Sequence, residues 1–451
     1  MLACLGRHTL TGLACTAGRQ ALDWSSDCRF FSEAIWHPDG LFDPVRKGVR
    51  ELEPQGMPYL VLPDDTYLKK TGKKIPGVKY IRDPMSPPFH SNFIRGQRFL
   101  QISALLPAQA EPGPARAIPI DYQHIPPIPK PDRDARSETW EAYHRRQREE
   151  NKNACAVRRI RHIREQMDHI FATPQDPLVV IGDGGFCNGP FLKPLPERTT
   201  FIGRVRADAK FYYPLPNPLS SARGRRRQYG DRAPTPDQLR KDENVQWEVV
   251  KAYAAGEVRD FSVKRIRCIY WRKIGPTCPL QLVVIRPLGY RLRKGSRILY
   301  RHPGYLICTD PHLPLHKLVQ YYVWRYDVEV NHRDEKQIIG VGQAQVRNHQ
   351  AAERVPTFAV AAYAMLLLAG AQTYGPSATE PQLPLPKWRT KSPRHRLTTT
   401  DLIRQLRHDL WSETLVGIPA ISGNFLTPRP PGTKPSKFDS SLSSAVLYTL
   451  P

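Results

Sequence analysis

The segment from Tyr322 to Lys336 places an acid, two cations and a phenol in a regular pattern. Tyr322, Arg325, Glu329 and Lys336 are separated by two, three and six residues. On a helix with about 100° between successive residues, the four side chains share a stripe roughly 60° wide. Carboxylates bind divalent metals, whereas arginine and lysine bind phosphate. The stripe therefore predicts a site for a metal and a phosphate group.

Two further acidic positions follow apolar runs that read as buried strands. Tyr59–Leu62 stops shortly before Asp64 and Asp65, and Leu178–Ile181 leads to Asp183 and two glycines. A strand presents its last side chains at the sheet edge, so both acidic positions can belong to one site. Three carboxylates with open positions are sufficient to hold two magnesium ions for an in-line attack on phosphorus.

Each of these features has a more ordinary interpretation by itself. The charged residues after Tyr322 could form salt bridges along a solvated helix. Asp183 before two glycines is typical of a turn, and Asp64 with Asp65 could form a turn or a helix cap. Their joint occurrence in one chain favours the metal-dependent site.

Composition indicates a large globular protein with a polyanionic partner. The chain has 451 residues, 40% of them hydrophobic, which is enough for two or more domains. Its formal net charge is +25, and the basic residues are spread along the whole length. Neutralising phosphates releases condensed counterions, so this excess favours DNA. No segment reads as a basic amphipathic membrane anchor.

Cysteine usage and the terminal segments favour a reducing cytoplasm. Eight cysteines lie without the close pairs that hold zinc, so we expect buried or inert thiols. The first residues carry Arg7 and His8 within an apolar run and lack a signal-peptide core, so we expect no export. The apolar run from Val355 is about sixteen residues long, short of a membrane span, and predicts a buried helix.

The patterning divides the chain into five parts. Residues 1–55 show helical spacing, and three strands, a long helix from Ser137 and a fourth strand follow. The next segments alternate and are rich in β-branched and aromatic residues. We therefore predict an α/β protein with a helical domain (1–55), an α/β part (56–198), a β-rich insertion (199–315), a second α/β part (316–375) and a basic, partly disordered tail (376–451). Within the tail, Thr400–Trp411 reads as an amphipathic helix.

A basic loop lies inside the β-rich part. Arg223, Arg225, Arg226 and Arg227 stand in a Ser/Gly/Pro setting, which predicts a flexible loop. A solvated loop without a partner is the alternative. The net charge of the chain favours a DNA contact by Arg225, Arg226 and Arg227.

The motifs together resemble a known family. The sequence is similar to the DDE transposases of bacterial insertion sequences, in the branch with the Tyr-Arg-Glu-Lys (YREK) signature, which matches at all four positions. The similarity runs from FFSEAIW at Phe30 through DDTYLKKTGKK, GDGGF and RVRADAKFY to GVGQAQVRNHQAA. GDGGF alone is a weak motif, whereas the first and third acid motifs are specific.

This resemblance implies an RNase H-like catalytic domain, interrupted by the β-rich insertion domain and preceded by the N-terminal helical domain. Asp64, Asp183 and Glu329 would be catalytic and hold two Mg²⁺ or Mn²⁺. The family pattern of Asp, any residue and Thr selects Asp64, with Asp65 as the fallback. Tyr322, Arg325 and Lys336 would contact phosphates, and Trp271 or Trp324 would stack on a displaced base or else belong to the core.

The implied function is a DDE-type transposase, a magnesium-dependent DNA endonuclease and strand transferase. Its partners would be double-stranded DNA, as terminal inverted repeats and target, and a second copy of the chain in a homodimer on DNA. We expect no membrane association and a cytoplasmic, nucleoid-associated location. The alternatives are a catalytically inactive DNA-binding transposase relic and an RNase H-like nuclease of repair or RNA processing.

One expected element is not found in the sequence. No helix-turn-helix pattern is evident ahead of Asp64, and the first residues, MLACLGRH, enter a helical pattern abruptly. An N-terminal truncation that removes part of the DNA-end recognition domain is therefore one interpretation, and it would put activity in doubt.

Overall fold

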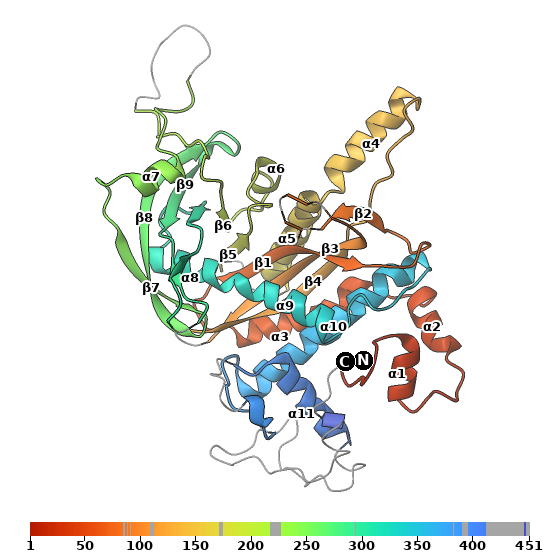
Figure 1. Cartoon of the computed structure of the whole chain (residues 1–451). Coiled ribbons are helices and arrows are strands. Elements are labelled where there is room, and N and C mark those ends of the chain that lie inside the picture. Colours follow the sequence, from red (N-terminus) through yellow and green to blue (C-terminus); the bar gives the residue numbers. More distant parts are fainter. Residues whose placement is uncertain are drawn as a thin grey trace.

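A computed structural model gives the fold of the chain. It describes residues 1–451 except 84, 85, 88, 91, 109–111, 171–174, 217–226, 294, 382, 390–395, 412–445 and 448–451. The architecture is mixed α/β, as the sequence predicts, with helices on both faces of one large sheet (Figure 1).

The central sheet has ten strands among the described residues, in the order β2-β3-β1-β5-β6-β12-β9-β8-β7, with β4 paired to β3. The pairs β1–β5 and β5–β6 are parallel, and the others are antiparallel. The strands are β1 (Tyr59–Lys69), β2 (Lys79–Arg82), β3 (Phe93–Pro107), β4 (Ala115–His124), β5 (Leu178–Gly182), β6 (Thr199–Arg204), β7 (Glu248–Ala254), β8 (Glu257–Trp271), β9 (Gly275–Ile285) and β12 (Gly304–Cys308). A separate hairpin-like pair joins β10 (Gly289–Tyr290) and β11 (Leu299–Tyr300).

The helices cover the sheet and its edges (Figure 1). They are α1 (Leu10–Thr16), α2 (Ser25–Ser32), α3 (Asp43–Leu52), α4 (Ser137–Glu149), α5 (Lys152–His169), α6 (Gly189–Leu192), α7 (Pro236–Lys241), α8 (Leu315–Trp324), α9 (Tyr326–Gln337), α10 (His349–Tyr374) and α11 (Thr399–Trp411). Two short 3₁₀ turns span Pro38–Phe42 and Lys387–Arg389.

The sheet separates two apolar cores, because successive strand residues point to opposite faces. On β1, Tyr59 and Val61 belong to the core beneath α3, α5 and α10. Leu60 and Leu62 belong to the core beneath α8. Such a strand is apolar on both faces, which explains its continuous hydrophobic run in the sequence.

Helix α10 is the long apolar segment that the sequence identifies as a core helix. Among the described residues it alone is long and apolar enough to cross a membrane, and 67% of its most apolar window is buried inside the fold. It packs on β4, α2, α3 and α11. The sequence also predicts α11, which begins one residue earlier than expected.

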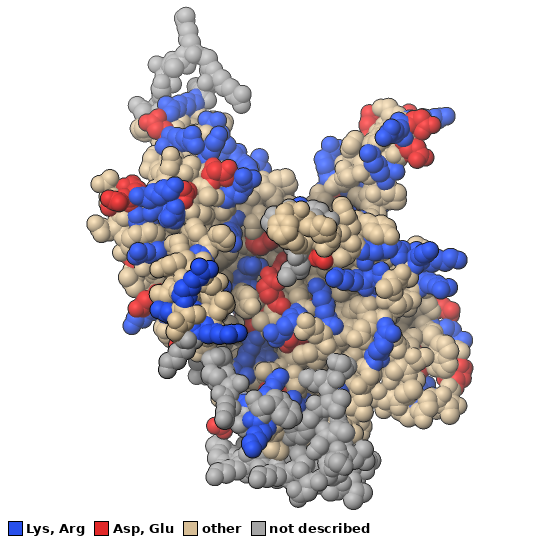
Figure 2. Space-filling model, viewed as in Figure 1, with Lys and Arg blue, Asp and Glu red and all other residues tan. Residues whose placement is uncertain are grey.

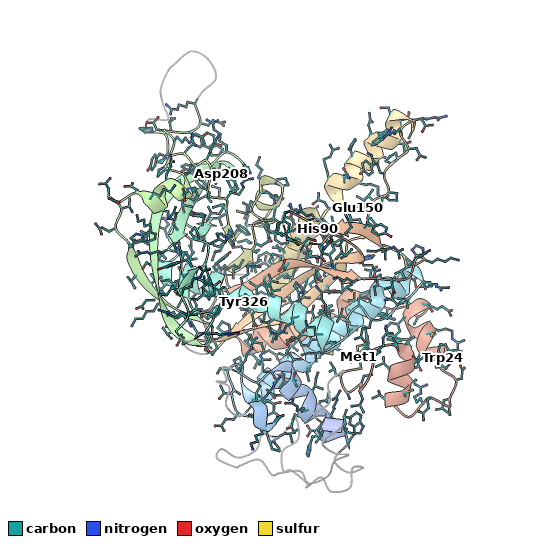
Figure 3. The ribbon with its side chains drawn as sticks, viewed as in Figure 1. Met1, Trp24, His90, Glu150, Asp208 and Tyr326 are labelled. Carbon is teal, nitrogen blue, oxygen red and sulfur yellow. The ribbon has the colours of Figure 1, made fainter. Side chains whose placement is uncertain are left out.

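The expected long helix from Ser137 is wrong in one respect, because it is two helices. Asn151 ends the continuity by accepting hydrogen bonds from the backbone N–H groups of Asn153 and Ala154, which caps α5. Helix α4 has no buried residue and projects from the body as an arm, with Glu150 at its base (Figures 1 and 3). Apolar periodicity from Val157 onward therefore describes α5 alone.

The segment 199–315 is rich in strands, but its strands continue the main sheet. Strand β6 pairs in parallel with β5, so it belongs to the parallel centre. Strand β12 then pairs with β6, and β9, β8 and β7 extend the sheet outward. We call β7, β8, β9 and β12, with the loops between them, the β extension. An apolar, β-branched run has the same sequence pattern in a central strand of the main sheet and in a strand of a separate insertion domain. The sequence therefore does not show where such a strand lies.

Candidate active site at the end of the parallel strands

Strand register brings two of the three predicted acids together. Strands β1 and β5 pair in parallel with Leu60 opposite Val179 and Val61 opposite Val180. Three residues farther along each strand, the same register places Asp64 beside Asp183. These acids are 119 positions apart in sequence and lie at the same level of neighbouring strands.

The sequence interpretation that β1 stops at its acids is wrong. Strand β1 continues to Lys69, and Asp64 pairs with Gln101 of β3. The parallel neighbour ends instead, because Asp183 and the two following glycines leave β5 in a turn. Asp64 therefore lies beside the point at which β5 leaves the sheet, on a strand that β3 still holds.

Alternation along β1 separates Asp64 from Asp65. Asp65 accepts a hydrogen bond from Lys152 Nζ at 2.7 Å and another from Arg98 Nε at 2.9 Å. Burial would raise the pKa of Asp65, but these two cations outweigh it and lower the pKa. Asp65 is thus held by a structural ion-pair cluster, and Asp64 points to the opposite side of the strand.

Arg325 lies between Asp64 and the third predicted acid, Glu329. Its Nη1 atom lies 3.7 Å from Asp64 Oδ2, and its Nη2 atom lies 3.7 Å from Glu329 Oε1. Asp64 is buried, with a side chain 12% exposed, whereas the Glu329 side chain is 49% exposed. The guanidinium therefore spans from the floor of the site to its open side.

The sequence predicts one continuous helix over Tyr322–Lys336, but the structure has two. Helix α8 ends at Trp324 and α9 begins at Tyr326, with Arg325 at the junction. The Arg325 N–H bonds to Tyr322 O at 3.2 Å, and the Val328 N–H bonds to Arg325 O at 3.1 Å, a tighter turn than an α-helix. Periodicity alone assumes one uninterrupted axis and does not show this junction.

The two ends of the predicted stripe occupy different surroundings. Tyr322 is half-buried and packs against the core beneath α8. Lys336 is exposed at the surface. Partial desolvation lowers its pKa, and the charges of Glu335, Glu329 and Asp64 only partly offset this. The structure thus joins Arg325 to both Asp64 and Glu329 and brings Lys336 within electrostatic reach of them.

Asp64 is the electrostatic centre of the site. Burial raises the pKa of its carboxyl group, and the charges of Glu329 and Asp183 raise it further. His332 and Arg325 act in the opposite direction. The carboxylates of Glu329 and Asp183 therefore both act on Asp64, and a cation beside Asp64 would relieve this repulsion.

His332 and Glu335 belong to this site but were not singled out from the sequence. His332 is 7% exposed; its Nε2 atom lies 3.9 Å from Asp64 Oδ2, and its Nδ1 atom lies 3.3 Å from Glu335 Oε2. Burial alone would lower the pKa of His332, but Glu335 and Asp64 outweigh it and raise the pKa. Its position three residues after Glu329 places it on the same helix face, which is the signal that could have revealed it.

The donor set fits a divalent cation in its chemistry. Asp64, Asp183 and Glu329 offer carboxylate oxygens, the ligands that Mg²⁺ and Mn²⁺ prefer. Among the described residues, no three His, Cys, Asp or Glu side chains converge closely enough to enclose an ion. The fit therefore rests on ligand type, on strand register and on the raised pKa of Asp64, which comes first from burial and then from the charges of Glu329 and Asp183.

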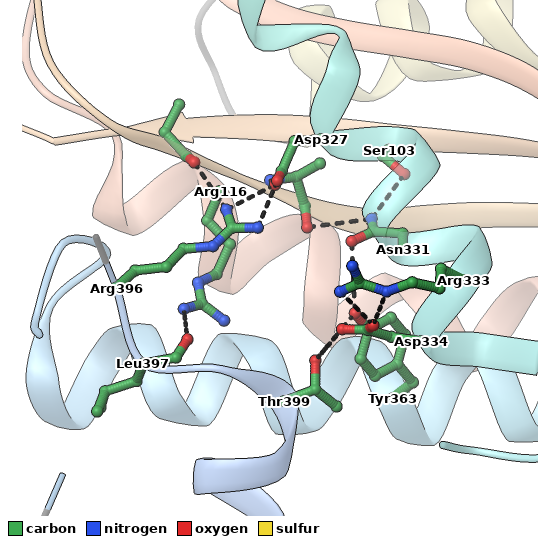
Figure 4. A network of polar contacts seen from close by, with 12 residues as sticks. Ser103, Arg116, Asp327, Asn331, Arg333, Asp334, Tyr363, Arg396, Leu397 and Thr399 are labelled. Atoms are coloured by element: carbon green, nitrogen blue, oxygen red, sulfur yellow. Dashed lines mark hydrogen bonds and ion pairs between the residues drawn. The ribbon is translucent and has the colours of Figure 1, made fainter. Parts of the chain in front are cut away.

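The far face of α9 is fixed by a buried polar network (Figure 4). Asp327 forms a two-pronged ion pair with Arg396 and accepts the backbone N–H of Ala117 at 2.6 Å. Two turns later, Asp334 accepts a hydrogen bond from Thr399 Oγ1 at 2.6 Å. Residues at the start of α11 thus hold the helix that carries Glu329.

Asn331 links the same face to the sheet. Its amide donates to Ala117 O at 3.1 Å and to Ser103 Oγ at 3.4 Å, and the Tyr363 hydroxyl donates to Asn331 Oδ1 at 3.4 Å. Strands β3 and β4 and helix α10 therefore meet at one buried side chain of α9 (Figure 4).

The other DNA-contact predictions have mixed outcomes. Arg225 and Arg226 lie outside the described residues. Arg227 is exposed and forms an ion pair with Asp231 at 2.8 Å. Trp271 and Trp324 are each 5% exposed, and Trp324 Nε1 donates to Gly113 O at 2.9 Å, so both tryptophans belong to the core.

Comparison with known proteins gives one match. Residues 1–273 match a family model described as DDE superfamily endonuclease. This range holds Asp64 and Asp183 and ends before Glu329. No curated protein matches the sequence.

Proposed function

The chain belongs to the DDE superfamily endonucleases, and from this premise we propose that it is a divalent-metal-dependent transposase that cleaves and rejoins DNA. The observation that carries the proposal is that Asp183 and Glu329 both lie within electrostatic reach of the buried Asp64. Strand register aligns Asp64 with Asp183, and Arg325 spans the 3.7 Å gaps to Asp64 and Glu329.

We propose that the five strands β4-β3-β1-β5-β6 form an RNase H-like catalytic unit. Three antiparallel strands are followed along the chain by helix α5 and then by two strands parallel to β1. This order supports the proposal because it brings the carboxyl end of β5 beside Asp64. The β extension follows the second acid and precedes the third.

In this proposal, Asp64, Asp183 and Glu329 hold two Mg²⁺ or Mn²⁺ ions. Such ions, when bound, supply Lewis-acid stabilisation of the charge on the attacked phosphate. Arg325 and Lys336 bind the phosphate oxygens, since among the described residues neither forms an ion pair shorter than 3.7 Å. The Tyr322 carbonyl helps to hold the junction that carries Arg325, because it accepts the Arg325 N–H at 3.2 Å.

The reaction that we propose has two phosphoryl transfers. Water attacks the phosphodiester at the element end and releases a 3′ hydroxyl group. That hydroxyl then attacks a phosphodiester of target DNA, and the bond to the leaving 3′ oxygen breaks. Asp64, being buried and fixed on β1, would hold its metal ion at a fixed position, whereas Glu329 is more exposed.

The partners in this proposal are the two terminal repeats of an insertion sequence and its target DNA, with two copies of the chain pairing the ends. The net charge of +25 supports a DNA partner. The location would be the cytoplasm, where chromosomal DNA is accessible.

The test is cleavage of labelled DNA that carries the ends of the surrounding element, with Mg²⁺ or Mn²⁺. We expect cutting at the element boundary by the wild type and none by Glu329→Gln. The matched control is Glu51→Gln, which removes one exposed carboxylate on α3. Binding without cutting by the wild type would indicate an inactive relic, and cutting without boundary preference would indicate a general nuclease.

A further inference from the structure

A basic groove runs from the candidate active site onto the β extension. A hollow of about 1260 Å³ begins at Gly184, the residue after Asp183, and passes between β6 and the end of β8. Six basic side chains line it: Arg204, Arg206, Lys210, Arg272, Lys273 and His302. Figure 2 shows basic side chains gathered over the β extension, to one side of a central hollow.

The positive charge of this groove is largely uncompensated. Asp208, labelled in Figure 3, is its one acidic lining residue, and it pairs with Arg206 at 3.0 Å. In the part of the chain that the structure describes, no carboxylate forms an ion pair with Lys210, Arg272 or Lys273. Exposed cations along one wall are suited to successive phosphates of a polyanion.

The groove ends at a stack of planar side chains. The Arg272 guanidinium lies 4.2 Å from the centre of the Tyr212 ring and 5.8 Å from that of Tyr229. The two rings lie 5.5 Å apart. A second hollow, of about 650 Å³, lies on the other side of Tyr212 and Arg272, so the stack stands between two open spaces.

The backbone holds this stack in place. The Tyr212 N–H donates to Tyr270 O at 2.9 Å, and the Tyr270 N–H donates to Tyr212 O at 2.8 Å. The Tyr213 N–H donates to Asp231 O at 2.9 Å, and the Gly230 N–H donates to Tyr213 O at 3.0 Å. A fixed platform loses little conformational entropy on binding, which a chance pair of surface rings would not offer.

We infer that this groove, from Gly184 to the Tyr212–Arg272–Tyr229 stack, binds an unpaired stretch of DNA. The cations contact its phosphates, and the guanidinium and phenol planes stack against its bases. A charged track that ends at exposed flat side chains suits a single strand, because paired bases do not expose their faces. The inference rests on the proposed function, which supplies the DNA strand. That strand would run from the candidate active site, past Gly184, into the groove.

The experiment is fluorescence anisotropy with a labelled single-stranded oligonucleotide of about 12 nucleotides and with its duplex, in EDTA. Arg272→Ala should weaken single-strand binding about tenfold and change duplex binding much less. Arg272→Lys, which keeps the charge without the plane, should recover only part of the loss. Lys210→Ala should flatten the dependence of single-strand affinity on salt concentration.

The matched control is Arg29→Ala, which removes an exposed arginine on α2, remote from the β extension (Figure 1). Equal single-strand binding by Arg272→Ala and Arg29→Ala would overturn the inference. Full recovery by Arg272→Lys, or an equal loss of duplex binding, would overturn the stacking of unpaired bases.

The two proposals fail separately, because this binding needs no metal. If no DNA is cut but Arg272→Ala still loses single-strand binding, the groove proposal is supported and the transposase proposal is contradicted. If Glu329→Gln abolishes cutting while groove variants bind normally, the reaction stands and the groove falls.

Discussion

The two faces of helix α9 differ in how completely their polar groups are paired. On the face toward α11, Asp327, Asn331 and Asp334 each accept or donate short contacts to fixed partners. On the face toward β1, Arg325 and His332 approach Asp64 only to 3.7 and 3.9 Å. One face is fixed by the fold, and the other retains polar groups for a ligand.

This difference follows from opposite requirements. A helix that presents a catalytic side chain must be held to within a fraction of an ångström, which the buried pairs achieve. A site that receives metal and phosphate must leave its charges incompletely paired, which costs stability. The variants below test whether the two requirements are separated on one helix.

The largest expected effect is on the open face. Glu329→Gln should lower the cleavage rate roughly 10³-fold, because a neutral amide is a poor ligand for a divalent cation. Its free energy of unfolding should change by less than about 0.5 kcal/mol, since the side chain is 49% exposed. Gel-based cleavage kinetics and urea unfolding measure the two quantities. A large loss of stability would show that Glu329 belongs to the structural face.

The largest effect on stability should come from Asp327→Ala. The change leaves the Ala117 N–H without its acceptor and the Arg396 guanidinium with only its hydrogen bond to Ala115 O, in a largely buried setting. Breaking such a pair from one side costs about 3 kcal/mol. Urea unfolding of the metal-free protein measures the loss. Asp231→Asn, at an exposed ion pair, should cost less than about 1 kcal/mol.

Thr399→Val should have a smaller effect on the same face. The substitution preserves shape but removes the 2.6 Å hydrogen bond to Asp334, costing about 1 to 2 kcal/mol. Cleavage should fall only in proportion to the loss of folded protein. If activity falls much more than stability, Thr399 sets the position of Glu329 rather than only strengthening the fold.

The smallest effect should be a pH dependence from His332. Its raised pKa means that the folded state favours the protonated ring, so its stabilisation is complete below the ordinary value of about 6.5. That contribution is lost as the pH rises through the folded-state pKa. The difference in unfolding free energy between wild type and His332→Gln should therefore shrink with rising pH in metal-free buffer. A difference that grows with pH would contradict the assignment.

The sequence predicts the acids better than it predicts their setting. Apolar runs followed by Asp64 and Asp183, and the spacing around Glu329, identify three acids of which two act electrostatically on the third, Asp64. The choice between Asp64 and Asp65 depends on strand register, because a shift of one residue exchanges the two faces of a strand. The pairing of β1 with β3 and β5 settles that register, and no local pattern contains it.

The residues that sequence reasoning missed are defined by contacts between distant segments. Arg396 meets Asp327 from 69 positions away, and Lys152 meets Asp65 from 87 positions away. Neither pair has a fixed spacing to recognise. The break at Arg325 likewise lacks a proline or glycine signal and arises where α8 and α9 pack on different parts of the sheet.

The contacts between α9 and α11 also order events during synthesis. A ribosome that has reached residue 375 has made all three acids, but neither Arg396 nor Thr399 has yet been added. Because chains begin to fold from the N-terminus as they emerge, the sheet can form while α9 still lacks its contacts with Arg396 and Thr399. The nascent protein thus passes through a stage in which the acids are present and Glu329 is not yet positioned. Glu329 can therefore reach its final position only after the chain has been synthesised through α11.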